Sequence, residues 1–188
     1  MSKLTLPLTP SAIEYVLLGF VRHEATHGYD IYRQLAEVDG LGLVWRPKQS
    51  QLYALLNKLE ADGLLAATLA YQETRPPRKL FHLTLSGTET FLSWVQTPVE
   101  HGRQFRLEFL GKLYFARREG TDAAANLLQR QKTVCQTWFD REQSGLNQVS
   151  PEHSFAYLVH TFRQGQIQAM LDWLAQCEQR LLVPSSPE

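Results

Sequence analysis

The sequence predicts a mainly helical protein in two parts, and three observations lead to this prediction. Apolar residues recur at helical spacing along most of the chain. Two strand-like runs interrupt this pattern between residues 64 and 84, after a third helix. Beyond residue 98 the periodicity is helical throughout. We therefore expect a mixed domain over residues 9–97 and an all-helical domain over residues 98–183.

The first predicted helix begins just after residue 9. Thr9 before Pro10 is a suitable N-cap, and Ser11 with Glu14 also fits a capping box. The predicted buried stripe of this helix consists of Ile13, Val16, Leu17 and Phe20.

Two further helices follow, each ending at glycine. The second carries Ile31, Leu35 and Val38 and ends at Gly40 and Gly42. The third starts near Pro47 and stops at Gly63. Its predicted buried stripe consists of Leu52, Leu55, Leu56 and Leu59.

A two-stranded hairpin is predicted after the third helix. Residues 64–71 and 79–84 have strand character, and residues 74–78 are expected to form a loop because two consecutive prolines do not continue a sheet. Ser86 to Glu89 resembles a capping box that opens a fourth helix. Three helices followed by such a hairpin are typical of the winged helix-turn-helix fold.

The second part is predicted to be a helical dimerisation domain. A dense apolar segment covers residues 105–115, a long helix starts at Thr121, and Ser150 to Glu152 caps a last helix. We expect a bend or a change of packing partner at Gly165. The aromatic and leucine side chains of these helices exceed what one thin layer can bury, which predicts a homodimer. These side chains include Trp138, Phe139, Phe155, Leu158 and Phe162.

Composition limits the class of protein without identifying a partner. The 19 basic and 19 acidic residues give no net charge, so only local charge can indicate a nucleic acid. No signal-like segment is expected at the N-terminus, and no apolar run reaches the ~20 residues that span a bilayer. We expect a soluble, cytoplasmic protein without a membrane partner. Cys135 and Cys177 are expected to be buried thiols, with a redox switch as the alternative.

The third helix carries the candidate site for double-stranded DNA. At 100° per residue, short polar side chains face away from the leucine stripe, and glutamine can pair with adenine in the major groove. Basic residues lie before the helix and in the predicted loop of the hairpin, where phosphates are expected. The predicted DNA-binding residues are Lys48, Gln49, Ser50, Gln51, Tyr53, Asn57, Lys58, Arg75, Arg78 and Lys79.

Alternatives to this interpretation remain open. The same residues can be an ordinary polar helix face and a solvated loop, and a winged helix with a neutral third helix can bind protein rather than DNA. The string from His23 to His27 matches the zinc-protease motif H-E-x-x-H, but it falls where the first helix should end and lacks a third ligand. We therefore expect neither an enzyme nor a metal or other cofactor.

Three segments resemble the PadR family of transcriptional regulators. They are His27 to Ile31, Leu52 to Leu64 with its Tyr-x-x-Leu-x-x-Leu-Glu spacing, and Phe81 to Gly87 with an aromatic-x-Leu-Thr pattern. The resemblance covers nearly all of residues 10–97, and the helical remainder is similar to the dimerisation domain of longer members. It implies a repressor-like homodimer on a near-palindromic promoter site.

The resemblance also implies a small aromatic effector, because members of the family often respond to such compounds. Indole rings stack well on flat aromatic molecules, which makes Trp94 the candidate ligand-binding residue, together with Trp138 and Trp173. Packing in the core or at an interface is the competing interpretation for each of them.

Overall fold

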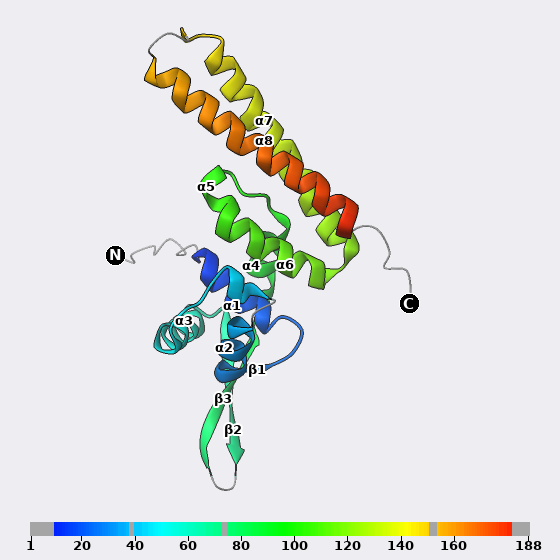
Figure 1. Cartoon of the computed structure of the whole chain (residues 1–188). Helices are drawn as coiled ribbons and strands as arrows, with labels where there is room; N and C mark the ends of the chain where they lie inside the picture. Colours follow the sequence, from blue (N-terminus) through cyan, green and yellow to red (C-terminus); the bar gives the residue numbers. More distant parts are fainter. Residues whose placement is uncertain (1–9, 38–39, 73–74, 151–153, 182–188) are drawn as a thin grey trace, which may run out of the picture. The chain divides into compact units, whose positions relative to one another are not determined.

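The computed structural model describes residues 10–37, 40–72, 75–150 and 154–181 (Figure 1). The chain divides into two compact units. The first contains the chain up to Val95 together with Arg106–Phe115, and the second contains Gln96–Phe105 and the chain from Ala116 onward. The chain therefore passes from one unit to the other three times, and residues 106–115 belong with the N-terminal part.

The first unit is a winged helix, as the sequence predicts. Its strands form one antiparallel sheet in the order β1-β3-β2, and β2 and β3 extend as a long ribbon (Figure 1). A short 3-10 turn, Leu41–Leu43, separates α2 from α3. The elements are α1 (Ala12–Phe20), β1 (Thr26–His27), α2 (Gly28–Ala36), α3 (Gln49–Ala61), β2 (Leu65–Gln72), β3 (Arg75–Leu83) and α4 (Leu85–Gln96).

Local side-chain and backbone geometry sets the ends of α1 and α3. Ser11 and Glu14 form the predicted capping box, with the Ser11 backbone N–H donating to Glu14 Oε2 at 2.7 Å. Thr9, the other predicted cap, lies outside the described residues, as does Val38 at the predicted end of α2. Gly63, with φ of +74°, ends α3 as predicted.

The predicted cap of α4 at Ser86 is wrong, because Thr84 performs that role. Thr84 Oγ1 accepts a hydrogen bond from the Gly87 N–H at 2.9 Å, and it also lies 2.8 Å from the Gly63 carbonyl oxygen. Thr84 lies between β3 and α4. Through these two contacts its hydroxyl joins Gly63, just after α3, to the first turn of α4. The helix consequently begins at Leu85.

The predicted loop over residues 74–78 is also wrong in part, since β3 already begins at Arg75. Arg75 pairs with Gln72 and Arg78 with Ala70, across a register shift in β2. β1 pairs with Leu80 and Phe81 of β3, and among the described residues no strand pairs with that edge of β3 where the two prolines lie. Prolines, which lack an N–H, are tolerated at such an open edge or next to a bulge.

The core of the first unit is aromatic and is completed by the returning segment Arg106–Phe115. Phe81, Phe91, Phe109 and Phe115 are all less than 2% exposed. The Phe115 ring meets Phe91 edge to face with ring centroids 5.7 Å apart. The predicted apolar segment over residues 105–115 comprises a π-helical turn, Phe105–Phe109, and the start of α6 (Leu110–Glu119).

In the second unit, α7 (Thr121–Leu146) and α8 (Phe155–Leu181) lie side by side as an antiparallel pair (Figure 1). α7 starts at Thr121 as predicted, after Gly120 with φ of +127°. The fully buried Gln131 accepts a hydrogen bond from the Val99 N–H at 2.8 Å and donates one to the Val99 carbonyl at 3.3 Å. This amide holds the segment Gln96–Phe105, which includes the short helix α5 (Gly102–Gln104), against α7.

α8 differs from the prediction at its start. Pro151 and Glu152 of the predicted cap lie outside the described residues, and the helix begins at Phe155. It runs through Gly165 as one continuous helix, so no break occurs there. The burial of its apolar residues changes instead: Phe162 is 65% exposed, whereas Ile167 is 7% exposed. No helix within the described ranges is long and apolar enough to cross a membrane.

Both cysteines are free thiols. Cys135 is buried and Cys177 is half-buried. Burial raises the pKa of each thiol above its ordinary value, which keeps both largely protonated and poorly nucleophilic at neutral pH.

Candidate nucleic-acid interface

α3 presents a polar face opposite a buried leucine stripe. Leu52, Leu56 and Leu59 are fully buried, while Leu55 is half-buried. The 3.6-residue period then turns the intervening side chains outward. The predicted groove residues are all exposed: Gln49, Ser50, Gln51, Tyr53 and Asn57.

Lys58, which also lies on α3, is held by two carboxylates. Its Nζ lies 2.5 Å from Glu14 Oε1 and 3.0 Å from Asp62 Oδ2. Glu14 is only 4% exposed, so this contact ties α3 to the buried side of α1. The positive charge of Lys58 is therefore shared with acidic groups of the protein.

The ionisation of Glu14 follows from the same contacts. Burial favours the neutral acid, but the hydrogen bonds from Lys58 and Ser11 outweigh it and hold the Glu14 pKa below its ordinary value. Glu14 is thus a buried carboxylate in the folded protein. Its charge fixes the position of α3 through Lys58.

The N-terminus of α3 has the features of an anion site on a helix of 13 residues. Its N-cap, Lys48, is exposed and makes no side-chain cap, and the first turn contains no acidic residue. The positive end of the helix dipole is consequently not offset by a carboxylate of that turn.

The loop before α3 is fixed in place. Arg46 Nε donates to the Gly42 carbonyl at 2.8 Å. The ring of Trp45 lies against Gly111, where a Cβ would come within 2.7 Å of it. This close approach requires glycine at position 111, and it sets the start of α3 against the core.

A hollow of about 620 Å³ opens beside α3, between the helix and the wing. Gly28, at the start of α2, leaves room for the ring of Tyr53 beside the hollow, because a Cβ at position 28 would lie 2.8 Å from Tyr53 Cε1. The hollow brings together groove and wing residues that are far apart in sequence. It is lined by His27, Gly28, Tyr29, Tyr53, Asn57, Arg78, Lys79 and Phe81.

The wing supplies the basic groups of this hollow. Arg78 and Lys79 are exposed, and Lys79 Nζ lies 2.5 Å from Glu60 Oε2 on α3. The Lys79 carbonyl oxygen lies 2.9 Å from His27 Nδ1, which joins β1 to the wing. The side chain of Arg75, the third predicted wing residue, lies outside the described part of the structure.

Sequence reasoning missed Tyr29 and His27 as parts of this surface. Tyr29 is 52% exposed and lines the hollow with Tyr53. The Gly-Tyr pair at residues 28 and 29 was visible as a motif, but helical periodicity alone does not place it beside the wing. The pairing of Thr26 and His27 with Phe81 and Leu80 in the sheet brings the two segments together.

Trp94 is a core residue of the first unit. It is 5% exposed and stacks on Tyr15 with ring centroids 5.0 Å apart. Its Nε1 donates to Glu108 at 3.1 Å, and its carbonyl accepts from the buried Lys112 at 2.9 Å. These contacts are those of a packed and hydrogen-bonded side chain. Its predicted role in binding an effector stays a prediction.

The H-E-x-x-H string does not lie on a helix. α1 ends at Phe20, and His27 belongs to β1, so His23 and His27 do not share a helical face. Among the described residues, no group of three or more His, Cys, Asp or Glu side chains is placed to hold a metal ion.

A winged helix whose third helix presents an uncharged polar face beside a basic wing belongs to the helix-turn-helix class of proteins. Residues 17–92 match the model of the transcriptional regulator PadR-like family, and residues 105–181 match that of the virulence activator alpha C-terminal domain. The chain belongs to the PadR family of transcriptional regulators. The family and the curated relatives named below are regulators, so the protein is a regulator and not an enzyme.

Two curated relatives are similar to this chain. The negative transcriptional regulator PadR of Bacillus subtilis is 31% identical over 124 residues, which cover 64% of this chain and 67% of the relative. The probable transcriptional regulator Rv1176c of Mycobacterium tuberculosis is 25% identical over 95 residues, which cover 50% and 49% of the two chains.

Solved structures are similar over most of the chain. The crystal structure of Bacillus subtilis PadR in complex with operator DNA shares 25% identity, covers 91% of this chain and 99% of that chain, and has a TM-score of 0.46. The structure of smu.1604c from Streptococcus mutans shares 20% identity, covers 89% and 98%, and has a TM-score of 0.42.

Proposed function

We propose that this regulator is a cytoplasmic repressor that binds a near-palindromic promoter site as a homodimer and reads its sequence through α3. The observation that carries the proposal is the exposed polar face of α3 beside a hollow lined by Arg78 and Lys79. Short uncharged groups suit base edges, and cations at the margin suit phosphates.

The proposal divides the predicted residues by role. Gln49, Ser50, Gln51, Tyr53 and Asn57 contact base edges in the major groove. Lys48 at the α3 N-terminus and the wing residues Arg75, Arg78 and Lys79 contact phosphates. Lys58 supports α3 through Glu14, because its ammonium is paired with two carboxylates, whereas Lys79 is paired with Glu60 alone and exchanges that carboxylate for a phosphate.

The hollow is proposed to receive the sugar-phosphate backbone. It adjoins the α3 face, and Arg78 offers a guanidinium that can hold two phosphate oxygens. Tyr29, which is 52% exposed, supplies a hydroxyl for the same strand. This arrangement would fix the register of α3 on the duplex without itself reading sequence.

The proposal of a homodimer rests on exposed apolar side chains in the first half of α8. Phe155, Leu158 and Phe162 are 79%, 62% and 65% exposed, and their spacing places them on one helical face. Such a stripe of large apolar side chains favours a second copy as its cover. Repression is proposed by similarity, since the curated relative from Bacillus subtilis is named a negative regulator.

The first test is a titration of the DNA upstream of the protein's own gene at two salt concentrations. Affinity should fall steeply with salt, because each neutralised phosphate releases counterions. Arg78→Ala should weaken binding to all sequences alike and reduce the salt slope by about one. Arg180→Ala, at the exposed end of α8, is the matched control and should leave both quantities unchanged.

The second test concerns sequence preference. Gln51→Ala should alter the preferred bases, at a cost of about 1–3 kcal/mol for the lost contact. A uniform loss across sequences would remove the base-reading role of Gln51. Binding that is absent, or insensitive to salt, would favour a protein-interaction module instead.

A further inference from the structure

His27 lines the hollow beside α3, and the two nitrogens of its imidazole have different roles. Nδ1 lies 2.9 Å from the carbonyl oxygen of Lys79 on β3. A carbonyl oxygen only accepts hydrogen bonds, so Nδ1 carries the hydrogen of the neutral ring. Nε2 of that ring is then an acceptor, and it has no hydrogen-bond partner among the described residues. Protonation of Nε2 would turn it into a charged donor and leave the contact with Lys79 in place.

The sheet fixes the position of this imidazole. His27 pairs with Leu80, and the preceding residue, Thr26, pairs with Phe81. Thr26 is only 8% exposed, and its hydroxyl donates to the Glu24 carbonyl at 3.1 Å. The imidazole is thus tethered through the backbone of β1 and through Nδ1. Within the described part of the chain, Nε2 is the ring nitrogen that remains for a ligand.

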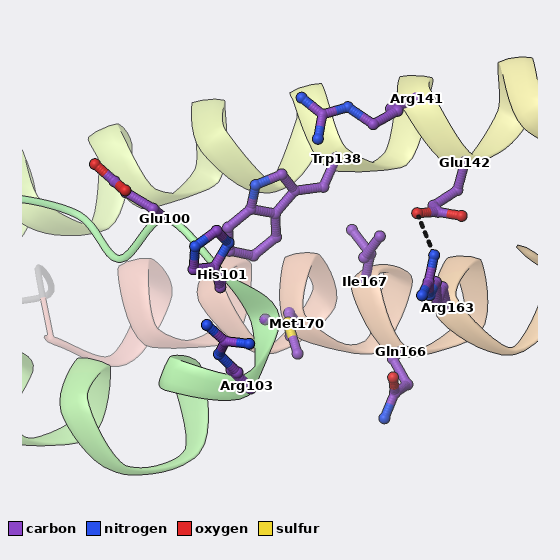
Figure 2. A pocket seen from close by; sticks show the side chains of 11 residues that line it. Glu100, His101, Arg103, Trp138, Arg141, Glu142, Arg163, Gln166, Ile167 and Met170 are labelled. Atoms are coloured by element: carbon purple, nitrogen blue, oxygen red, sulfur yellow. Dashed lines mark ion pairs between the residues drawn. The ribbon is translucent and has the colours of Figure 1, made fainter.

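The charges around the imidazole suit an anion. The other titratable side chains that line the hollow are Arg78 and Lys79 from β3, Tyr29 from α2 and Tyr53 from α3. Lys79 is paired with Glu60, but no described residue of the lining itself is a carboxylate. The cavity of the second unit differs, because Glu142 lines it and pairs there with Arg163 at 3.8 Å (Figure 2). A phosphate in the hollow beside α3 would therefore meet cations and no carboxylate of that lining.

We propose that His27 binds a DNA phosphate through Nε2 in its protonated form, so that DNA binding takes up a proton. The proposal rests on the proposed function, in which this hollow receives the sugar-phosphate backbone. A histidine changes its charge between about pH 5 and pH 8, and an adjacent anion favours the charged form. The neutral ring offers a phosphate oxygen only a lone pair at Nε2, which makes no hydrogen bond to it. Because the complex holds more protons than the unbound protein, affinity rises as the pH falls through this range.

The test is the binding of a random-sequence duplex at constant ionic strength, since phosphate contacts do not depend on sequence. The affinity of the unsubstituted protein should rise roughly fivefold between about pH 8 and about pH 6. Calorimetric titration at neutral pH, in two buffers with different heats of ionisation, should show that a fraction of a proton is taken up. A constant affinity, or binding without proton uptake, would overturn the proposal.

His27→Asn isolates the role of Nε2. The asparagine amide nitrogen takes the place of Nδ1 and can donate to the Lys79 carbonyl, but nothing replaces Nε2. This variant should match the unsubstituted protein within about twofold at about pH 8 and should lose the gain at about pH 6. His82→Asn is the matched control and should keep the gain. His82 follows Phe81 on β3, so its side chain points to the other face of the sheet.

The outcomes separate the role of His27 from DNA binding itself. A gain that persists in His27→Asn would overturn the proposal. An equal loss of affinity at both pH values would do the same, because it would indicate that the ring only supports the wing. Steeply salt-dependent binding without proton uptake would remove the role of His27 alone. A protein that binds no duplex would remove the DNA-binding proposal as well.

Discussion

Glu14 links the interior of the first unit to the helix that carries the candidate DNA-binding face. Its carboxylate is buried, yet the Lys58 and Ser11 hydrogen bonds outweigh burial and lower its pKa. A carboxyl whose pKa is lowered by folding stabilises the folded state above its ordinary pKa. That stabilisation is lost as the pH falls through the lowered value.

The pH dependence of stability tests this role of Glu14. Glu14→Gln should lower the free energy of unfolding at neutral pH by about 2 kcal/mol, and the difference from the unsubstituted protein should shrink as the pH falls below about 4. Urea unfolding at a series of pH values measures it. Glu24→Gln, at an exposed position, is the control. A difference that does not vary with pH would contradict the account.

Gly28 offers a test of the hollow beside α3. A Cβ at this position would lie 2.8 Å from Tyr53 Cε1, so Gly28→Ala should displace the partly exposed tyrosine. We expect DNA affinity to fall by about 1 kcal/mol, roughly fivefold. Gly40→Ala is the matched control, since no described residue beyond its chain neighbours lies within 4 Å of the added methyl. Equal DNA affinities for the two variants would argue that the placement of the Tyr53 ring has no role in DNA binding.

At the scale of elements, the contact between α4 and the start of β2 depends on Gly87. A Cβ there would collide with the Leu64 carbonyl oxygen, which is backbone and cannot turn away. Gly87→Ala should therefore destabilise the protein by about 3 kcal/mol. Gly165→Ala, on the open surface of α8, should instead stabilise it by about 0.5–1 kcal/mol. Thermal or urea unfolding of the two variants should give shifts of opposite sign.

The elements also show what sequence patterns can predict and what they cannot. The leucine period predicted the buried side of α3 and hence its exposed polar face, because a helix fixes side-chain direction at 100° per residue. The ends of elements depend on tertiary partners instead. Thr84 replaced Ser86 as the cap of α4 because it also contacts Gly63. β3 extends through two prolines at an edge with which no strand of the described ranges pairs.

The candidate site, like the fold, was predictable from the sequence only in part. Its α3 residues follow from one helix, so periodicity found them. Tyr29 and His27 enter the site only through the pairing of β1 with β3, which joins residues more than 50 positions apart. Likewise, the pairing of Lys58 with Glu14 required the packing of α1 against α3, which no local pattern encodes.

At the scale of the whole molecule, the exposed stripe on α8 bears on assembly. Sedimentation should give a dimer for the unsubstituted protein, and Leu158→Glu should shift it toward monomer, because a charge in an apolar interface is left without a partner. Leu43→Glu, at a similarly exposed leucine of the first unit, is the control and should remain dimeric. A monomeric unsubstituted protein, or a dimer that survives Leu158→Glu, would contradict this assignment.

The central claim is that α3 reads DNA sequence in a dimer, and selection of bound sequences from a random duplex pool tests it most directly. The account predicts enrichment of one near-palindromic motif, with half-sites about 34 Å apart along the duplex. The Gln51→Ala protein should enrich a motif altered inside each half-site, whereas Arg78→Ala should enrich the same motif less strongly. A pool that shows no enrichment, or the same motif and yield for all three proteins, would contradict the claim.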